Sequence, residues 1–272
     1  MGRLAGQWWS GHDGSSRVTS VLTSEFPGTE IAESALLGGR VRLRQPVSGY
    51  RAGMDAALLA AAVAARPGDR VFEAGCGAGA VLAQVAARRP ETLLTGLERD
   101  PAAAALAREN AALNGFEGRM TVLTGDVADG FRPLDLKPFD WAVSNPPFFD
   151  DAGALRAPAP GKRGAWMADD GLAAWSSLLL KAVRENGKIL MIHRADRLAD
   201  ILSTLGEKAG SFVILPIQPF ADQPAKRVLV QAVRTGRAPL KLLPALVLHD
   251  RSGAKHTPEA EAILRGEADL TL

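Results

Sequence analysis

Hydrophobic residues in the middle of this chain gather in short runs, which are separated by longer stretches that are partly polar. Runs that are dense in aliphatic residues and bounded by glycine or polar residues predict strands buried on both faces of a sheet. The predicted strands cover residues 70–74, 92–98, 120–124, 139–143, 188–192, 211–217 and 227–233. The short alternation Val41-Arg42-Leu43 predicts one more strand in front of them.

Between these strands, apolar residues recur at helical spacing. Asp100 and Pro101 predict a helix start, because aspartate caps free amides and proline suits the first turn, and Gly115 predicts the end of that helix. The predicted helices cover residues 52–65, 78–88, 101–114 and 197–205, and another begins at Asp169 or Asp170. Alternating strands and helices predict an α/β fold: a Rossmann-like, seven-stranded, mostly parallel sheet with helices on both faces. The short link before residues 227–233 predicts that this last strand is antiparallel.

The first part of the chain lacks this periodicity. Residues 1–30 are rich in Gly, Ser and Thr. We therefore expect residues 1–35 to form a loose N-terminal extension and residues 36–272 to form one domain. With 47% hydrophobic residues, the 272-residue chain can bury a substantial core.

Composition and charge argue against several classes of protein. The longest apolar run, residues 54–65, is shorter than the roughly 20 residues that span a bilayer, and residues 1–20 lack the apolar region of a signal peptide. Cys76 is the one cysteine, so no internal disulfide forms, and the four histidines lack zinc-ligand spacing, so we expect no metal. These features favour a soluble, cytoplasmic protein. A net charge of +2 is compatible with a nucleic-acid partner, and the oligomeric state has no signature here.

A glycine-rich turn follows the first strand of the predicted sheet, in Glu73-Ala74-Gly75-Cys76-Gly77-Ala78-Gly79. Open α/β sheets bind ligands at such strand ends, where glycine lets a ligand approach the backbone. Gly75-x-Gly77-x-x-Ala80, with Glu98 to hold a ribose, matches the dinucleotide fingerprint of an NAD-dependent oxidoreductase. S-adenosylmethionine is the alternative, because it also has a ribose that an acid can hold. Unlike NAD it carries positive charges and no pyrophosphate, and an acid just before the turn, Glu73, suits a cation and offers a pyrophosphate nothing. Asp126, after the third strand, is an acceptor for the amine of its adenine.

The fourth strand runs into Asn145-Pro146-Pro147-Phe148-Phe149, where the prolines end the sheet ladder. This motif follows Glu73-x-Gly75-x-Gly77-x-Gly79, Gly96-Leu97-Glu98-Arg99-Asp100 and Gly125-Asp126 in the chain. In order and spacing the four pieces resemble the class I S-adenosylmethionine-dependent methyltransferases, over about residues 40–235. The resemblance implies S-adenosyl-L-methionine as the cofactor. The residues expected to bind it are Glu73, Gly75, Gly77, Gly79, Glu98, Asp126 and Asn145.

In that family an Asn-Pro-Pro motif followed by Tyr or Phe marks enzymes that methylate a planar amine or amide nitrogen. Such a nitrogen is a poor nucleophile, because its lone pair is delocalised. By resemblance, the Asn145 side-chain oxygen and the Pro146 carbonyl accept its two N–H groups, and Phe148 stacks on the flat substrate. Asn145, Pro146 and Phe148 are therefore the expected catalytic residues.

Residues 44–55, 144–149 and 223–230 resemble, more narrowly, the bacterial tRNA1(Val) adenine-37 N6-methyltransferase family. This implies an N6-adenine methyltransferase with tRNA as its partner. The expected substrate contacts are Phe148, Phe149, Lys162, Arg163, Lys226 and Arg227. The alternatives are a small-molecule O- or N-methyltransferase, a protein glutamine N5-methyltransferase, and a non-catalytic RNA-binding module that retains the fold.

Overall fold

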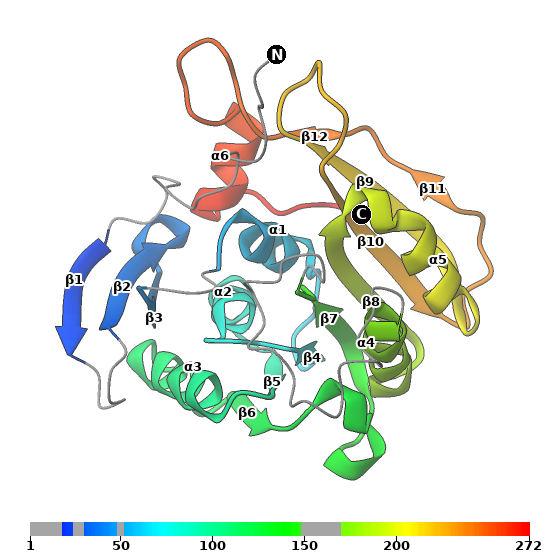
Figure 1. The fold of residues 1–272 in the computed structure, drawn as a ribbon, viewed down its shortest axis with the longest axis horizontal. Helices are drawn as coiled ribbons and strands as arrows, with labels where there is room; N and C mark the ends of the chain where they lie inside the picture. Colours follow the sequence, from blue (N-terminus) through cyan, green and yellow to red (C-terminus); the bar gives the residue numbers. More distant parts are fainter. Residues whose placement is uncertain (1–17, 24–29, 48–51, 148–169) are drawn as a thin grey trace, which may run out of the picture.

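The computed structural model describes residues 18–23, 30–47, 52–147 and 170–272. In these ranges the chain forms a large twisted sheet between two layers of helices, and a small sheet lies at one side (Figure 1). None of the helices in the described ranges is long and apolar enough to cross a membrane.

Within the described ranges the main sheet has nine strands, in the order β11-β9-β10-β8-β7-β4-β5-β6, with β12 paired to β9. The strands are β4 (Arg70–Ala74), β5 (Leu93–Glu98), β6 (Met120–Thr124), β7 (Phe139–Ser144), β8 (Val183–Arg194), β9 (Ala209–Gln218), β10 (Arg227–Arg234), β11 (Lys241–Leu242) and β12 (Leu246–Val247). Strand β10 is antiparallel to both of its neighbours, whereas the other pairings are parallel. The α/β fold, its seven predicted strands and the antiparallel last strand are confirmed. Two short strands that were not predicted, β11 and β12, have two residues each and pair with β9.

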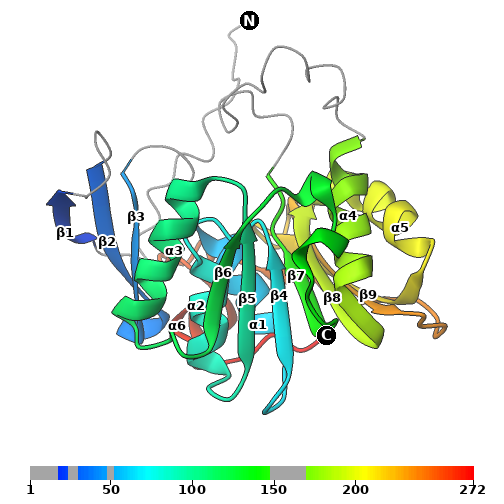
Figure 2. The same cartoon turned by 90° about the horizontal axis from the view of Figure 1, so that it is seen from below.

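Helices cover both faces of the sheet (Figure 2). Both faces are apolar because successive side chains of each buried strand point to opposite sides. Val71 packs with one layer, whereas the adjacent Phe72 packs with the other. The first layer contains α1 (Met54–Ala62), α2 (Ala80–Arg88), α3 (Pro101–Leu113) and α6 (Pro258–Arg265). The second layer contains α4 (Asp170–Ala182) and α5 (Leu198–Gly206). Elsewhere in the described ranges, short 3₁₀ turns lie at Leu37–Gly39, Val127–Asp129, Arg132–Leu134 and Ala195–Arg197.

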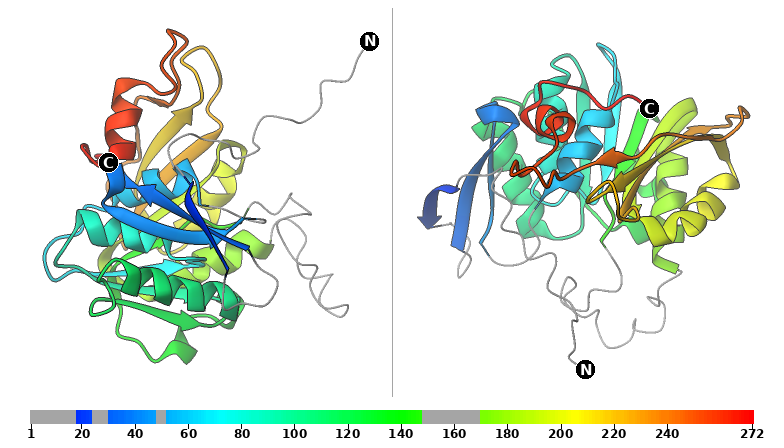
Figure 3. Two further views of the ribbon diagram at one scale, coloured as in Figure 1. Left: turned by 90° about the vertical axis from the view of Figure 1, so that its left-hand side faces the viewer. Right: turned by 90° about the horizontal axis from the view of Figure 1, so that it is seen from above.

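The expectation that residues 1–35 form a loose extension does not hold for the part of that range that the structure describes. Strands β1 (Val18–Thr23), β2 (Glu30–Leu36) and β3 (Val41–Pro46) form an antiparallel sheet, and the predicted boundary at residue 35 falls inside β2. Figure 3 shows this small sheet beside α2 and α3. The alternation at residues 41–43 predicted β3, whereas β1 and β2 escaped prediction, because the stability of such strands depends strongly on their cross-strand partners.

Helix α6 was also missed, although its local signals are present. Thr257 caps the helix, Pro258 occupies its first position, and Gly266 ends it in the left-handed conformation. The helix lies beside the turn between β2 and β3 (Figure 3). There the Arg40 side chain donates to the Gly266 carbonyl at 2.7 Å.

Candidate active site

The glycine-rich turn leaves the carboxyl end of β4 in a conformation that needs glycine. Gly75 and Gly77 have φ angles of 67° and 53°, in the left-handed region. A Cβ atom on Gly75 would lie 2.3 Å from the Trp175 ring of α4, whereas a Cβ on Gly77 would meet nothing within 4 Å. The turn is therefore packed against a helix at Gly75 and open at Gly77, where a ligand can approach the backbone closely.

Glu98, the last residue of β5, reaches across to this turn. Its Oε2 accepts from the Gly77 amide at 2.9 Å, and its Oε1 accepts from the Asp100 amide at 2.9 Å. A carboxylate has about four lone-pair sites, so both oxygens retain acceptor capacity. Glu98 therefore fits the role expected for it, because a ribose hydroxyl at the edge of the turn would find an oriented acceptor.

Glu73 lies below the turn in β4, with 2% of its surface exposed. Its Oε2 has no hydrogen-bond partner among the described residues. Burial, with the nearby Glu98 charge in addition, raises the pKa of Glu73 well above its usual value of 4.5. From the sequence, Glu73 is expected to be an anion that attracts a cation. The structure instead places Glu73 where burial favours its protonated form, and a ligand cation nearby would favour its ionisation.

Asp126 follows β6, the strand next to β5, and lies at the same edge of the sheet. Its Oδ1 accepts from the Ala128 amide at 2.9 Å and so caps a 3₁₀ turn. Its Oδ2 lies 3.7 Å from the guanidinium of Arg99, which immediately follows Glu98. The carboxylate is thus held in place beside the Glu98 corner, and its contact with an adenine amine stays a prediction.

The Asn-Pro-Pro motif begins directly after β7, the other neighbour of β4. Ala74 and Ser144 are paired residues of the two parallel strands, and the Ser144 hydroxyl donates to the Ala74 carbonyl at 3.1 Å. Gly75 and Asn145 therefore leave adjacent strands at the same level. Asn145 is half-buried and Pro146 is buried, whereas Phe148, Phe149, Lys162 and Arg163 lie outside the described residues.

The two other predicted substrate contacts are at the start of β10, which runs beside β8. Lys226 is exposed. The Arg227 guanidinium instead forms a 3.0 Å ion pair with Asp55 in the first turn of α1, and both side chains are largely buried. The structure therefore gives Arg227 an internal partner that the sequence argument did not foresee, and its contact with a substrate stays a prediction.

Three residues near this edge of the sheet were not singled out from the sequence. They are Trp175 in α4, Ser144 at the end of β7, and Asn110 in α3. Asn110 is fully buried on α3. Its signal was available, because a second asparagine, Asn114, follows one helical turn later. Among the described residues, no three His, Cys, Asp or Glu side chains gather as a metal site would require.

Comparison with known proteins relates this chain to several methyltransferases. The family model of the methyltransferase small domain matches residues 49–157. A tRNA1(Val) (adenine(37)-N6)-methyltransferase from Porphyromonas gingivalis is 31% identical over 119 residues, which are 42% of this chain and 45% of that protein. A release factor glutamine methyltransferase from Geobacter sulfurreducens is 40% identical over 63 residues, which are 23% of this chain and 20% of that protein. The chain therefore spans less than half the length of these curated relatives.

A solved structure matches much more of the chain. It is that of a predicted O-methyltransferase from Agrobacterium tumefaciens, with a TM-score of 0.67 and 28% sequence identity. The match covers 80% of this chain and 99% of that one. The similarity therefore extends well beyond residues 49–157.

Proposed function

We propose that this chain, which belongs to the class I S-adenosylmethionine-dependent methyltransferases and uses S-adenosylmethionine as its cofactor, methylates N6 of an adenine in tRNA. The proposal concerns the substrate and the atom that is methylated. It rests on the chemistry of residues 145–148 and on the curated tRNA methyltransferases that the chain resembles.

One observation carries the proposal: Gly75 and Asn145 emerge from paired positions of adjacent parallel strands, tied by the Ser144–Ala74 hydrogen bond. Neighbouring parallel strands lie about 4.8 Å apart. A cofactor on the glycine turn and an acceptor group on the Asn145 corner would therefore be in reach of one another. Holding two reactants in this way removes much of the entropic barrier to transfer.

The residues present suit this reaction. When bound, S-adenosylmethionine supplies an electrophilic methyl group on a positively charged sulfur. Glu98 binds the ribose, while the Asn145 side-chain oxygen and the Pro146 carbonyl accept the two N–H groups of the adenine amine. This contact orients the nitrogen lone pair toward the methyl group. The methyl group would pass from the cofactor to this nitrogen, the electrons of the S–C bond would stay on sulfur as a neutral thioether, and one N–H proton would be released to water.

The two alternative substrates carry different chemical groups. The release factor glutamine methyltransferase similarity favours a glutamine amide as the second candidate, because that nitrogen is also planar and delocalised. The single Asn-Pro-Pro corner serves both groups equally well. The choice of tRNA rests on the P. gingivalis relative, which matches a longer part of this chain.

The test uses three separate reactions, each with the chain and S-adenosylmethionine labelled on its methyl group. The first contains bacterial tRNA, the second a release factor and the third adenosine. Nucleosides and peptides are then analysed by mass spectrometry. We expect labelled N6-methyladenosine from the tRNA alone. Label on a release-factor glutamine, or on adenosine but not on tRNA, would overturn the substrate assignment.

Two variants separate the roles of the two strand ends. Asn145→Ala should lower the transfer rate roughly 100-fold or more, as the loss of one positioned polar partner does in other active sites, while affinity for S-adenosylhomocysteine stays nearly the same. Glu98→Ala should instead weaken the affinity for S-adenosylhomocysteine, because the ribose loses its acceptor. Equal loss of cofactor affinity in both variants would place Asn145 in the cofactor pocket and not at the substrate.

A further inference from the structure

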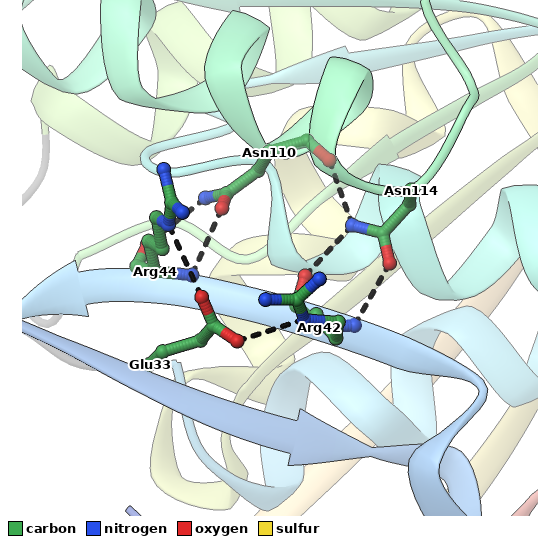
Figure 4. A network of polar contacts seen from close by, with 5 residues as sticks. All are labelled: Glu33, Arg42, Arg44, Asn110 and Asn114. Atoms are coloured by element: carbon green, nitrogen blue, oxygen red, sulfur yellow. Dashed lines mark hydrogen bonds and ion pairs between the residues drawn. The ribbon is translucent and has the colours of Figure 1, made fainter. Parts of the chain in front are cut away.

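Helix α3 meets the small sheet through two asparagine side chains (Figure 4). The Asn110 Oδ1 accepts from the Arg44 amide at 2.8 Å, and its Nδ2 donates to the Arg44 carbonyl at 2.9 Å. Asn114 binds Arg42 in the same way, at 2.8 and 2.7 Å. Each side chain thus satisfies both backbone groups of one residue in β3, as a neighbouring strand would.

The match between helix and strand is geometric. Four residues along a helix advance about 6 Å, and two residues along a strand advance about 6.6 Å. Asn110 and Asn114 therefore face alternate residues of β3 on the edge that β2 leaves unpaired. On the β2 side, Glu33 binds the side chains of Arg42 and Arg44 and holds the two strands together (Figure 4).

The two asparagines differ in the use of their remaining N–H. The second N–H of Asn110 is directed to the Ala78 carbonyl, at 2.9 Å, inside the glycine-rich turn. That of Asn114 is directed to the Asn110 carbonyl of its own helix, at 2.7 Å. Asn110 therefore joins three parts of the molecule, α3, β3 and the turn, whereas Asn114 joins only the helix and the strand.

The turn depends on such contacts because Ala78 lies between Gly77 and Gly79, which both have positive φ angles. Glycine lacks a Cβ atom, so these two residues restrict the backbone conformation little by themselves. Glu98 holds it from one side through the Gly77 amide. Asn110 holds it from the other side through the Ala78 carbonyl. The peptide groups that face the proposed cofactor are thus fixed from β5 and from α3 together.

We propose that Asn110 is a positioning residue for cofactor binding, and that it couples the small sheet β1–β3 to the glycine-rich turn. Binding of the cofactor to the turn then stabilises the docking of β3, and docking of β3 strengthens binding, because a coupling free energy acts equally in both directions. This inference rests on the cofactor part of the proposed function and does not depend on the nucleic-acid substrate.

The matched variants are Asn110→Asp and Asn114→Asp. Each keeps the oxygen that accepts from β3 and places a second oxygen against two carbonyl groups, but only Asn110→Asp affects the turn. The Kd for S-adenosylhomocysteine, measured by titration calorimetry, should rise about tenfold in Asn110→Asp, which corresponds to about 1.4 kcal/mol, and stay within about twofold in Asn114→Asp. Equal changes in the two variants would overturn the inference.

Amide hydrogen exchange in the unchanged chain tests the coupling without a variant. S-adenosylhomocysteine should slow exchange in β3 (Val41–Pro46) more than in α5 (Leu198–Gly206), which lies on the other face of the sheet. No difference between these segments would overturn the inference, even if Asn110→Asp fails to fold. If S-adenosylhomocysteine does not bind at all, both the inference and the proposed function are overturned. If it binds but the chain transfers no methyl group to tRNA, only the proposed function is overturned.

Discussion

Replacing Gly75 by alanine probes the contact between the glycine-rich turn and α4. Gly75 has a φ of 67°, and an added Cβ would lie 2.3 and 2.8 Å from two carbon atoms of the Trp175 ring. Real Cβ atoms do not approach so closely, so either the ring or the turn must move. Gly77→Ala is the matched control, because Gly77 also has a positive φ, of 53°, but a Cβ there would meet no atom within 4 Å.

The expected cost has two parts. Placing an L-residue in the left-handed region costs about 1–2 kcal/mol, and this applies to both variants. Overpacking against a fixed neighbour adds about 1–3 kcal/mol, and this applies to Gly75→Ala alone. The free energy of unfolding should therefore fall by about 2–5 kcal/mol in Gly75→Ala and by about 1–2 kcal/mol in Gly77→Ala.

The assay is urea unfolding of the cofactor-free chain, in which stability is obtained from the midpoint and the slope. A double-mutant cycle with Trp175→Ala isolates the contact, because the alanine change at Gly75 should then cost no more than the one at Gly77. Equal costs for the two glycine variants, or an unchanged cost of Gly75→Ala in the Trp175→Ala background, would refute the reasoning.

Two further predictions concern charged side chains. Because the pKa of Glu73 is raised in the folded chain, the folded chain keeps a proton that the unfolded chain releases above about pH 4.5. The contribution of Glu73 to stability is therefore fully present below about pH 4.5 and is lost as the pH rises through the pKa of the folded chain. Glu73→Gln should remove this fall in a pH series of urea unfolding, and an unchanged pH slope would contradict the assignment. Asp55→Asn should cost about 1–3 kcal/mol, because it leaves Arg227 largely buried without its carboxylate, whereas Glu261→Gln in the exposed pair with Arg265 should cost about 0–1 kcal/mol. Thermal unfolding of the two variants side by side measures the difference, and equal shifts would argue against the burial of the Asp55 pair.

The main sheet and the location of the site could be predicted from the sequence because both depend on local patterns. A buried parallel strand is a mostly apolar run, so the strands at residues 70–74 and 139–143 were recognisable in isolation. The helix boundary at Asp100 and Pro101 follows from capping chemistry within a few residues. Parallel strands place their carboxyl ends at one edge, and so the motifs after β4, β5, β6 and β7 had to lie near one another.

What the sequence by itself determined is therefore the order of elements and the edge of the sheet at which the chemistry takes place. Only the tertiary structure decided which partner each polar group has. Burial under the turn raises the pKa of Glu73, and Asp55 forms an ion pair with Arg227. Asn110 connects the Arg44 backbone of β3, 66 positions away in the chain, to the Ala78 carbonyl, 32 positions away. The physical reason is that hydrogen bonds and pKa values depend on distance and exclusion of water in three dimensions, and neither has a period along the sequence.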